Sequence, residues 1–584
     1  MLDIFFNSRN EYNKIPFGAC RCNERIVFRL QVRCDAPVKA YINLNNAKLE
    51  MKLEKIEWNL SSFIISVNTP DIPGLSFYYF TVSTPYHTVY FGNAKDGMQG
   101  MGIKYDKDPV PYQITVYDEY STPDWLKGRV MYQIFPDRFY KEHLLKSLTW
   151  DRKYHDNWND LPFTEEDYTC REMDCSDFFG GNLQGIIKKL DHLKKLNAGA
   201  LYLNPIFKAY SNHRYDTADY MTIDETLGTN EDFRELCEKA AQKDIYIILD
   251  GVFSHTGSDS IYFNRNGTFD STGAYQSADS VYREWYKINK DGTYESWWGI
   301  KTLPDTDEMN SSFQKYIFDA VQYWLDLGAK GFRLDVADEL PDAFIKKLRN
   351  VLKRKDPDAV LIGEVWEDAS NKKSYDMQRE YLWGQELDSV MNYPYRNAIL
   401  DFTRGFIDAN KFVRKIEIIK ENYPKQSYDC LMNFLGTHDV PRLISILGDD
   451  DRYSGLQRDK QKNIKLSDGA YARAKKKVKF ATKLLMTLPG APCIYYGDEA
   501  GVEGLNDPMN RRTYPWGTED QDLMEFFREC TCFRDQREEM QKGSFDITAV
   551  DEHTLSIRRS YENAITQVIF DRKAYLFSED TKSV

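Results

Sequence analysis

The chain has 584 residues, of which 42% are hydrophobic and 14% aromatic, and its formal net charge is −13. A chain of this length and apolar content is expected to fold into several domains with a large core. The excess of acidic residues argues against a nucleic-acid partner, because phosphate backbones bind to basic faces. No apolar run approaches the ~18 residues of a membrane-spanning helix, so no membrane partner is expected.

Targeting and redox signals point to one compartment. Residues 1–8 lack a basic stretch followed by an apolar run, so we expect no signal peptide. The 10 cysteines are scattered, and the close pairs Cys20/Cys22 and Cys530/Cys532 match neither a zinc nor a redox motif. Unpaired thiols are typical of a reducing environment, so the sequence predicts a cytoplasmic protein.

Residues 1–122 have the pattern of an all-β module. Apolar residues occupy every second position of the run 26–32, and similar short strands are indicated at 38–44, 63–67 and 77–82. Asn, Asp, Pro and Gly residues separate them, which is typical of a small β-sandwich. Its role stays open between ligand binding, dimerisation and covering the domain that follows. The run 121–124 marks the expected boundary.

From Arg129 onward, strand-like runs alternate with amphipathic helices. Strands are predicted at 130–135, 200–205, 245–253, 331–336, 360–366, 389–393, 431–437 and 492–496, and helices at 183–196, 231–242, 311–327, 341–355 and 472–488. This alternation predicts an α/β fold, a (β/α)8 TIM barrel over residues 123–541. An inserted domain is expected after the third strand at about 256–304, and a small C-terminal β domain at 542–584.

The predicted fourth strand breaks the apolar pattern of a buried barrel strand. Arg333 and Asp335 alternate with Phe332 and Leu334, and buried charges are costly unless they pair with each other or with a substrate. The fifth strand ends on a second carboxylate, Glu364. Two carboxylates at adjacent strand ends suit acid/base and nucleophilic work on a glycosidic bond. The alternative is two structural salt bridges.

Other predicted strand ends carry polar groups too. The third strand leads from Asp250 to His255, and the seventh to His438 and Asp439. The chain has only 8 histidines, and a third one, His213, lies in the loop after the second strand. Because the carboxyl ends of barrel strands meet on one face, these residues are expected to converge, which favours a functional site over isolated structural residues.

These motifs, in this order, resemble glycoside hydrolase family 13, the α-amylase family, and within it the neopullulanase and cyclomaltodextrinase-like or amylopullulanase-like branch. The resemblance spans roughly residues 125–516. It is carried by the runs 132–139, 250–255, 331–335, 363–366, 438–439 and 494–499. The β-rich N-terminus is similar to a module of that branch that in relatives often serves dimerisation, so a homodimer through this module is an open expectation.

The resemblance implies a retaining double displacement. Asp335 would be the nucleophile, Glu364 the general acid and then base, and Asp439 the third acid, which stabilises the oxocarbenium-like state. Arg333 stands two residues before Asp335, on the same side of the strand, and would keep that carboxylate ionised by lowering its pKa. The residues expected to bind the α-glucan are His255, His438, Tyr215, Asp250, Trp366, Asp507 and Arg511.

The family's usual calcium site is not supported by this sequence. Ser254 stands where many α-amylases have a ligating Asn, and Glu339 where calcium-dependent members often have His. Residues 140–143 replace an Asn- and Asp-rich loop, and calcium needs several oxygen ligands. We therefore expect that no metal or other cofactor is required, although calcium binding stays open.

The leading functional expectation is hydrolysis of α-1,4 bonds in maltooligosaccharides, starch fragments, cyclodextrin or pullulan, with some transfer to sugar acceptors. The alternative is an α-1,6-cleaving enzyme or a dedicated transglycosidase of the same family. The segment 297–304, where relatives carry a subgroup fingerprint, does not decide between them. A remote alternative is an inactive, barrel-shaped binding or scaffold protein, which would be expected to lack one of the two carboxylates and to carry a membrane anchor. Here both carboxylates are present and no anchor is recognised in the sequence.

Overall fold

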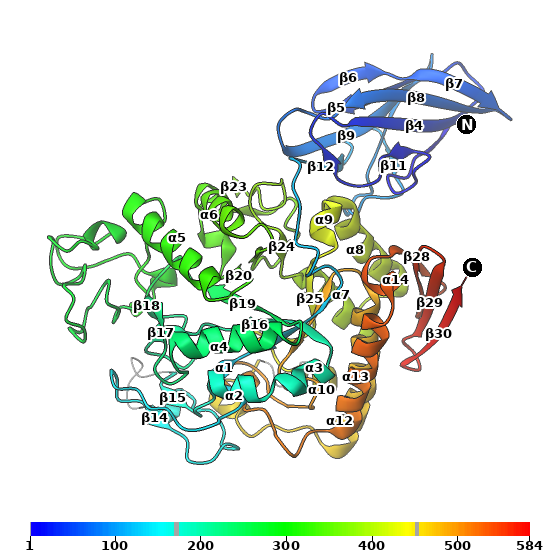
Figure 1. Cartoon of the computed structure of the whole chain (residues 1–584). Coiled ribbons are helices and arrows are strands. Elements are labelled where there is room, and N and C mark those ends of the chain that lie inside the picture. The colour runs from blue at the N-terminus through cyan, green and yellow to red at the C-terminus, as the bar shows by residue number, and fades with distance from the viewer. Residues whose placement is uncertain (1, 169–174, 450–454, 584) are drawn as a thin grey trace. The chain divides into compact units, whose positions relative to one another are not determined.

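The computed structural model describes residues 2–168, 175–449 and 455–583 (Figure 1). The chain forms two compact units, and neither is contiguous in sequence. The first comprises Met1–Ser121, Glu367–Asp388 and Lys411–Tyr428, and the second comprises Thr122–Trp366, Ser389–Asn410 and Asp429–Val584. The two short segments of the first unit fall within the range 123–541 in which the sequence places the barrel.

The first unit is built on a β-sandwich. One sheet has the order β1-β4-β8-β7, with β2 beside β4, and the other has the order β11-β10-β9-β12-β3, with β5 beside β9 and β6 beside β5. Alternate residues of β4 are buried, and Phe28 and Leu30 from this strand share a core with Tyr78 and Phe80 of the other sheet. The strands are β1 (Leu2–Phe5), β2 (Lys14–Ile15), β3 (Cys20–Arg21), β4 (Arg25–Cys34), β5 (Lys39–Leu44), β6 (Ala47–Glu50), β7 (Lys52–Glu57), β8 (Leu60–Asn68), β9 (Gly74–Ser83), β10 (Thr88–Gly92), β11 (Ile103–Tyr105) and β12 (Tyr112–Tyr117).

Specific contacts explain why the segment Lys411–Tyr428 belongs to this unit. Arg9 forms an ion pair with Glu421 at 3.0 Å, and both side chains are largely buried. Gln99 donates a buried hydrogen bond to Asn422 at 2.9 Å. Buried polar contacts of this kind fix the position of one segment on another, because an unpaired partner would lose its hydrogen bond.

The second unit contains a parallel barrel, which confirms the predicted fold class. Its strands follow the order β24-β21-β20-β19-β16-β13-β26-β25, and a parallel bridge between Met391 and Met432 joins the two ends of this row. Apolar side chains such as Met131, Ile248 and Ile362 fill its core. The barrel strands are β13 (Val130–Ile134), β16 (Ala198–Leu203), β19 (Tyr246–Gly251), β20 (Gly331–Leu334), β21 (Val360–Gly363), β24 (Ser389–Val390), β25 (Met432–Phe434) and β26 (Ala491–Tyr495).

Amphipathic helices alternate with these strands (Figure 1). In α5, Asn310 caps the N-terminus and the buried residues Phe313, Ile317 and Val321 recur at the helical period. The helices are α1 (Pro136–Phe139), α2 (Leu183–Lys188), α3 (Leu190–Lys195), α4 (Asn230–Ala241), α5 (Ser311–Asp326), α6 (Asp342–Lys355), α7 (Tyr393–Arg404), α8 (Ala409–Asn422), α9 (Lys425–Tyr428), α10 (Leu443–Asp449), α11 (Arg458–Gln461), α12 (Asp468–Thr487), α13 (Gln521–Asp535) and α14 (Glu538–Gln541). In the described ranges, none of them combines the length and apolar character that crossing a membrane requires.

The helix predicted at 183–196 is interrupted in the structure. The backbone of Lys189, with φ −101° and ψ 6°, leaves the helical region between α2 and α3. Its N–H donates to the carbonyl of Ile186, which tightens the turn to a 3₁₀ pattern. Both halves still bury leucines, among them Leu183 and Leu193, on one side. The sequence pattern continues across the break, so periodicity alone predicts one helix.

The insertion after the third barrel strand has little regular structure. It contains the 3₁₀ turns η3 (Arg283–Trp285) and η4 (Trp297–Gly299). Bridges between His255 and Asp305 and between Ser296 and Pro304 tie its ends together. Further short strands of the chain form two-stranded sheets: β14 (Lys153–Tyr154) with β15 (Asp177–Phe178), β17 (Phe207–Ala209) with β18 (Thr217–Ile223), and β22 (Lys373–Ser374) with β23 (Met377–Gln378).

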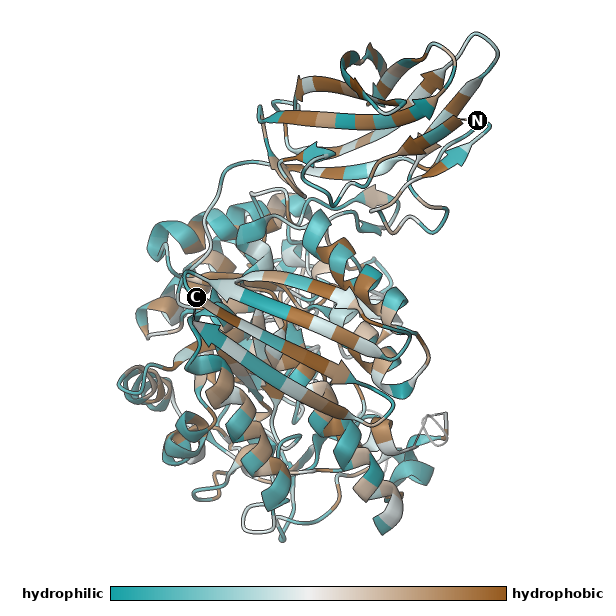
Figure 2. Cartoon of the chain, turned by 90° about the vertical axis from the view of Figure 1, so that its right-hand side faces the viewer, coloured by the Kyte–Doolittle hydropathy of each residue, from teal (hydrophilic) through white to brown (hydrophobic). Residues whose placement is uncertain are grey.

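The C-terminal residues form a four-stranded antiparallel sheet. Its strands pair in chain order: β27 (Ser544–Ala549), β28 (Thr554–Tyr561), β29 (Ala564–Asp571) and β30 (Leu576–Ser583). Figure 2 shows hydrophilic and hydrophobic residues alternating along these strands. The buried face includes Leu555, Ile557, Val568 and Phe570. This alternation is typical of a sheet with one face packed and one solvated.

Candidate active site

The carboxylates at the predicted strand ends lie at the carboxyl-terminal end of the barrel. Asp250 is near the end of β19, Asp335 follows β20, and Glu364 follows β21. The register pairs Asp250 with Arg333 and aligns the last residues of β20 and β21, so these side chains stand at similar heights on neighbouring strands. Asp439 lies in the loop after β25. The barrel therefore brings residues from distant parts of the sequence to one face.

The guanidinium of Arg333 links three of these carboxyl groups. Its Nη1 donates to Asp250 Oδ1 at 2.8 Å and to Asp335 Oδ1 at 2.7 Å. Its Nη2 lies 2.7 Å from Glu364 Oε2. The side chain of Arg333 is fully buried, and those of Asp335 and Glu364 are only 9% and 7% exposed. One planar cation thus fixes the positions of two carboxyl groups on adjacent strands.

The residue after Asp335 has a strained backbone that serves Glu364. Val336 has φ 39° and ψ 63°, a left-handed conformation that is unfavourable for a β-branched residue. In this conformation its N–H donates to Glu364 Oε2 at 2.8 Å. The other oxygen, Oε1, accepts from Trp366 Nε1 at 3.0 Å. Both oxygens of Glu364 are therefore oriented by fixed donors.

Tyr215 lies at the centre of a buried hydrogen-bond network. Its hydroxyl donates to Asp250 Oδ2 at 2.9 Å, and Tyr202 donates to the same oxygen at 2.6 Å. His438 Nε2 lies 2.6 Å from the Tyr215 hydroxyl, and the two rings stack with centroids 5.4 Å apart. Asp250 thus accepts hydrogen bonds from two phenols in addition to its bond from Arg333. It is a buried anchor for the binding residues around it.

Sequence reasoning missed the next layer of this network. Gln133 Nε2 donates to His438 Nδ1 at 2.9 Å and to Asn204 Oδ1 at 3.0 Å. Asn204 in turn donates to the Tyr215 hydroxyl at 3.0 Å. Because Nδ1 of His438 accepts a hydrogen bond, its Nε2 carries the proton and points it at Tyr215. The signal in the sequence was a polar residue within or directly after an apolar strand run, namely Gln133 in β13 and Asn204 after β16. Both side chains are buried in the structure.

Arg511 connects Asp439 with Asp507. Its Nη1 lies 3.0 Å from Asp507 Oδ1, and its Nη2 lies 3.7 Å from Asp439 Oδ1. Its Nε donates to the backbone carbonyl of His438 at 3.0 Å. The Asp439 side chain remains 27% exposed, so the third carboxylate is open to a ligand.

The remaining predicted residues flank this cluster. His255 Nδ1 lies 3.1 Å from Ser254 Oγ, and its ring centroid is 5.4 Å from that of Trp297. Trp366 is 46% exposed and stacks on Tyr393 at 3.9 Å. An exposed indole face held by a buried ring is a rigid platform for a ligand.

The histidines of this region are neutral hydrogen-bond partners. Burial and the charge of Arg511 hold the pKa of His438 well below its usual value. Burial also lowers the pKa of His255 to about 4 and that of His213 to about 3. His213 Nδ1 accepts from the backbone N–H of Tyr215 at 3.1 Å, so it supports the loop that carries this tyrosine.

The pKa of Asp335 differs from the value that the sequence led us to expect. Burial raises the pKa of Asp335 well above its usual range; Arg333 opposes the rise, and the charges of Glu364, Asp250 and Asp439 add to it. Burial and the charge of Glu364 raise the pKa of Asp439 to about 7. Arg333 therefore lowers the pKa of Asp335 as predicted, but the prediction that it keeps this carboxylate ionised is wrong, because burial and the neighbouring acids outweigh its charge. One guanidinium is outnumbered by buried carboxyl groups.

Ser254 and Glu339, the residues that weaken the calcium motif, both form hydrogen bonds with other protein side chains. Glu339 ends the 3₁₀ turn η5 (Ala337–Glu339), and its Oε1 accepts a hydrogen bond from Trp298 Nε1 at 3.2 Å. Ser254 bonds to the neighbouring His255. Across the described ranges, no group of three or more His, Cys, Asp or Glu side chains is placed to hold a metal ion.

The fold and the cluster together define a class: a (β/α)8 barrel protein with paired carboxylates around one arginine at the carboxyl ends of adjacent strands. Residues 133–565 match the family described as alpha amylase, catalytic domain. The chain therefore belongs to the α-amylase family, as its motifs predicted.

Relatives of known identity include longer proteins. An amylopullulanase of Thermoanaerobacterium saccharolyticum is 37% identical over 616 residues, which cover 96% of this chain and 47% of that protein. A cyclomaltodextrinase of Geobacillus thermopakistaniensis is 32% identical and covers 78% of this chain and 70% of its own length. The chain spans less than half the length of the amylopullulanases that it matches.

Solved structures show the same fold. The ligand-free cyclic α-maltosyl-(1→6)-maltose hydrolase from Arthrobacter globiformis has a TM-score of 0.65 and 31% identity, covering 77% of this chain and 92% of that chain. A cyclomaltodextrinase has a TM-score of 0.66 and 26% identity, covering 98% of this chain and 91% of that chain. The second match extends the likeness beyond the barrel.

Proposed function

We propose that the chain is a retaining α-glucan hydrolase that cleaves α-1,4 bonds. The observation that carries this proposal is the shared guanidinium of Arg333, which holds Asp335 and Glu364 at 2.7 Å each. Two carboxyl groups on either side of one guanidinium support the short separation of about 5–5.5 Å that retention needs, rather than the ~6.5–9.5 Å of inverting enzymes.

In the first step, a carboxylate oxygen of Asp335 attacks the anomeric carbon while the glycosidic C–O bond breaks. Glu364 gives its proton to the departing oxygen, so one product leaves with a new hydroxyl and the other stays as an ester on Asp335. The sugar brings a developing positive charge next to Asp335. This charge offsets the crowding of carboxylates and favours the ionised nucleophile.

In the second step, Glu364 takes a proton from a water molecule whose oxygen attacks the same carbon. The ester bond breaks and Asp335 returns as a carboxylate. An acceptor sugar hydroxyl in place of water gives transfer instead of hydrolysis. Asp439 binds sugar hydroxyls and stabilises the oxocarbenium-like state, with Arg511 fixing its orientation.

The flanking residues bind and orient the glucan. His255 hydrogen-bonds the sugar at the cleavage site, and His438, whose Nε2 points at Tyr215, orients the tyrosine ring that lies under that sugar. Asp250 anchors Tyr215 and Arg333, Trp366 stacks on the sugar beyond the cleavage site, and Asp507 with Arg511 grips the next glucose. Neutral imidazoles and satisfied hydrogen bonds support these roles, because preorganised groups need no rearrangement when the substrate binds.

Maltooligosaccharides, starch fragments, cyclodextrin and pullulan are the proposed substrates. The cyclomaltodextrinase relative supports a cyclic substrate. The amylopullulanase relative favours a second candidate activity, α-1,6 cleavage. Transfer by a dedicated transglycosidase is a further alternative. No metal or other cofactor is proposed as a requirement.

A reducing, cytoplasmic setting is proposed from the cysteines. None of the nine cysteines in the described ranges is joined to another of them by a disulfide. A relative named intracellular maltogenic amylase, from Bacillus subtilis, is 30% identical and covers 85% of this chain and 77% of its own length. A homodimer through the N-terminal module is a further proposal, which sedimentation of the full chain tests.

Product analysis tests the function. Incubation with maltohexaose, cyclodextrin and pullulan should give short products whose newly formed reducing ends have the α configuration. Panose from pullulan means α-1,4 cleavage, and maltotriose means α-1,6 cleavage. Products of β configuration from any substrate would rule out the retaining mechanism.

A further inference from the structure

A polar cavity of about 720 Å³ lies next to the segment that carries Arg511. Its walls come from the loops that follow β13, β25 and β26, which are neighbours in the barrel. Arg512 lines the cavity, whereas the preceding Arg511 bonds to Asp507. Among the described residues that line it, none belongs to the catalytic and binding set proposed above. The cavity is therefore a separate feature on the same barrel face.

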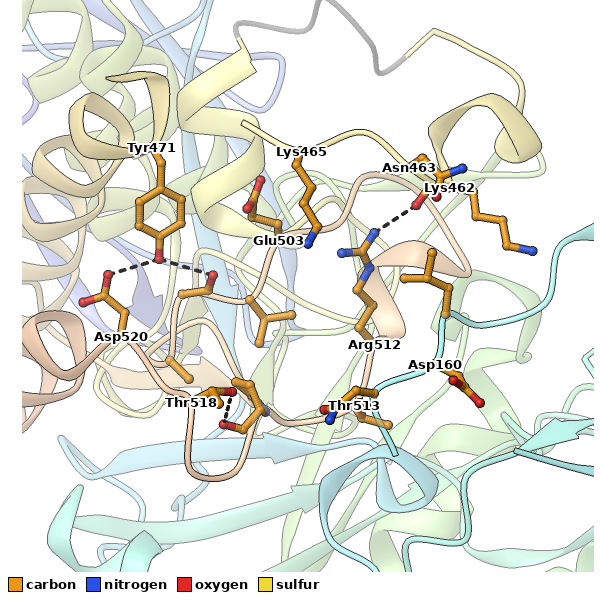
Figure 3. Close-up of a pocket in the computed structure, with 16 residues that line it drawn as sticks. Asp160, Lys462, Asn463, Lys465, Tyr471, Glu503, Arg512, Thr513, Thr518 and Asp520 are labelled. Carbon is orange, nitrogen blue, oxygen red and sulfur yellow. Dashed lines mark hydrogen bonds between the residues drawn. The ribbon is translucent and has the colours of Figure 1, made fainter. Parts of the chain in front are cut away.

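Two cationic side chains of the cavity form no ion pair within the described ranges. Arg512 Nη2 donates to the backbone carbonyl of Lys462 at 3.1 Å, and within the described ranges its guanidinium has no carboxylate at ion-pair distance. Figure 3 shows Lys465 between Glu503 and Arg512. Lys465 likewise has no ion pair in the part of the chain that the structure describes. Cations in such positions keep their donors available for a ligand.

Two carboxylates in the same walls also lack a lysine or arginine partner. Glu503 Oε2 accepts only from the backbone N–H of Leu466 at 2.7 Å among the described residues. Asp160 lies 3.5 Å from His155 and keeps 41% of its side chain exposed. The other acidic wall residue, Asp520, is already engaged by Lys475 at 2.9 Å. Apart from Lys462 and Asp520, which form ion pairs with Asp167 and Lys475, the charged side chains of the walls are thus two cations and two carboxylates.

This balance selects the kind of ligand. A phosphate or other anion offers mainly acceptors, and its negative charge would be repelled by Glu503 and Asp160. Each hydroxyl of a sugar both donates and accepts, so it can satisfy a carboxylate and a guanidinium together. Apolar wall residues such as Leu161, Val502 and Pro515 suit the C–H faces of a pyranose ring. The volume falls within the ~300–1,000 Å³ of small-molecule sites.

We infer that this cavity is a second, non-catalytic site for a hydroxyl-rich ligand, a short α-glucan. The choice of glucan rests on the proposed function, since the substrate is the sugar that this barrel face meets. The ligand bridges Lys465 and Arg512 on one side with Glu503 and Asp160 on the other. Occupation of the site holds a glucan chain beside the loop that presents Arg511.

The experiment measures maltotriose binding to the full chain by titration calorimetry. The Asp335→Asn background prevents turnover, and Lys465→Ala or Arg512→Gln is added to it. Lys476→Ala, an exposed lysine of α12 outside the cavity, is the matched control. We expect two binding events in the background and the control. One of them should weaken at least tenfold in both cavity variants, while melting temperatures stay within those of the control.

Each alternative result has a distinct meaning. Two events that survive unchanged in both cavity variants, or a single event that neither variant alters, overturn the second site and leave the proposed function standing. No maltotriose binding in any folded variant contradicts the α-glucan function itself. Titration with inorganic phosphate separates the ligand classes: phosphate binding that Arg512→Gln abolishes would overturn the glucan assignment.

Discussion

Two buried arginine–carboxylate clusters in the second unit show opposite electrostatics. In one, Arg152 makes a two-pronged contact with Asp224 at 2.9 Å through each terminal nitrogen, and Arg214 lies 3.4 Å from the same carboxylate. Here two cations surround one acid. In the catalytic cluster, Arg333 contacts three acids, Asp250 at 2.8 Å and Asp335 and Glu364 at 2.7 Å each.

The pKa shifts follow this ratio of charges. Burial acts to raise the pKa of Asp224, but Arg214 and Arg152 outweigh it and hold the pKa well below its ordinary value. Burial raises the pKa of Asp335, and there Arg333 does not outweigh the neighbouring acids. The first cluster is electrostatically satisfied in the folded chain. The second stays short of positive charge in the folded chain, and in the proposed mechanism the oxocarbenium-like transition state supplies that charge.

The comparison teaches how to distinguish a structural ion pair from a catalytic one when both are buried. A structural pair stabilises the fold, so its acid is more acidic than in the unfolded chain. A catalytic cluster keeps acids crowded at a cost in stability, because their charges are needed in the transition state. The sign of the stability change on neutralising each acid therefore separates the two roles.

The largest expected effect is on catalysis. Asp335→Asn and Glu364→Gln keep the shape of the side chains but remove the nucleophile or the transferable proton. We expect each to lower kcat on maltohexaose by at least about a thousandfold. Asp224→Glu, which keeps the charge in the structural cluster, is the control and should stay active. A variant that retains more than about a tenth of the wild-type rate would not carry the role assigned to it.

A large effect of the opposite kind is expected for stability. Asp224→Asn leaves two buried guanidinium groups without a carboxylate and should cost about 3–5 kcal/mol. Asp335→Asn removes one of the crowded acids and should leave the unfolding midpoint unchanged or raised. Urea unfolding of both variants, followed by circular dichroism, measures the difference.

A second change covers the case in which Asp224→Asn does not fold. Thr226→Val removes the hydroxyl that donates to Asp224 Oδ1 at 2.5 Å and should cost about 1–2 kcal/mol. Asp224→Asn and Asp335→Asn could instead shift the urea unfolding midpoint in the same direction and by similar amounts. In that case the ratio of cations to acids does not distinguish a structural cluster from a catalytic one.

The pH dependence of stability sharpens the comparison at Asp439. Its pKa rises from 3.8 to about 7 on folding, so between these values the folded chain holds a proton that the unfolded chain releases. The stability from this group is complete below about pH 4 and is lost as the pH rises through 7. Asp439→Asn has no carboxyl group at this position, so it does not lose this stability. The melting temperature of the variant minus that of the wild type should therefore increase between pH 4 and 7 and stay constant above pH 7.

We expect the melting temperature of Asp439→Asn to increase relative to the wild type by only about 1–3 °C over this pH range, because the partly exposed carboxyl group is screened by solvent. Asp279→Asn, in an exposed position of the insertion, is the control and should track the wild type at every pH. A constant difference between Asp439→Asn and the wild type across this range would show that Asp439 has no raised pKa.

Sequence patterns located the acids of the site but not its electrostatics. Arg333 and Asp335 stood out because charges occupied positions of a buried strand, and the barrel order then placed Glu364 beside them. The sign of the pKa shift at Asp335 depends on how many acids approach in space, which linear spacing does not give. Gln133 and Asn204 were missed for the same reason, because their roles arise from the neighbours that β13 and β16 acquire when the barrel closes.

The structural cluster was not visible in the sequence at all. Arg152 and Asp224 are 72 residues apart and lie in segments with no motif. The unit boundary shows a similar limit: Glu421 belongs with the N-terminal sandwich through its contact with Arg9, 412 residues away. Long-range polar contacts of this kind depend on side-chain geometry and leave no periodic signal.

The smallest expected effect is that of chelation. A bound cation beside the crowded carboxylates could supply the positive charge that Arg333 alone does not, so the comparison between the clusters depends on whether one binds. Ser254 and Glu339 weaken the calcium motif, and the described ranges hold no group of three or more His, Cys, Asp or Glu side chains placed for a metal. We therefore expect EDTA to change the melting temperature by less than about 1 °C and to leave the rate on maltohexaose unchanged. The contrary result is a loss of rate or stability that calcium restores and magnesium does not. It would mean that a calcium ion offsets the negative charge of this cluster. The shortage of positive charge at Asp335 would then be smaller than the protein side chains alone imply.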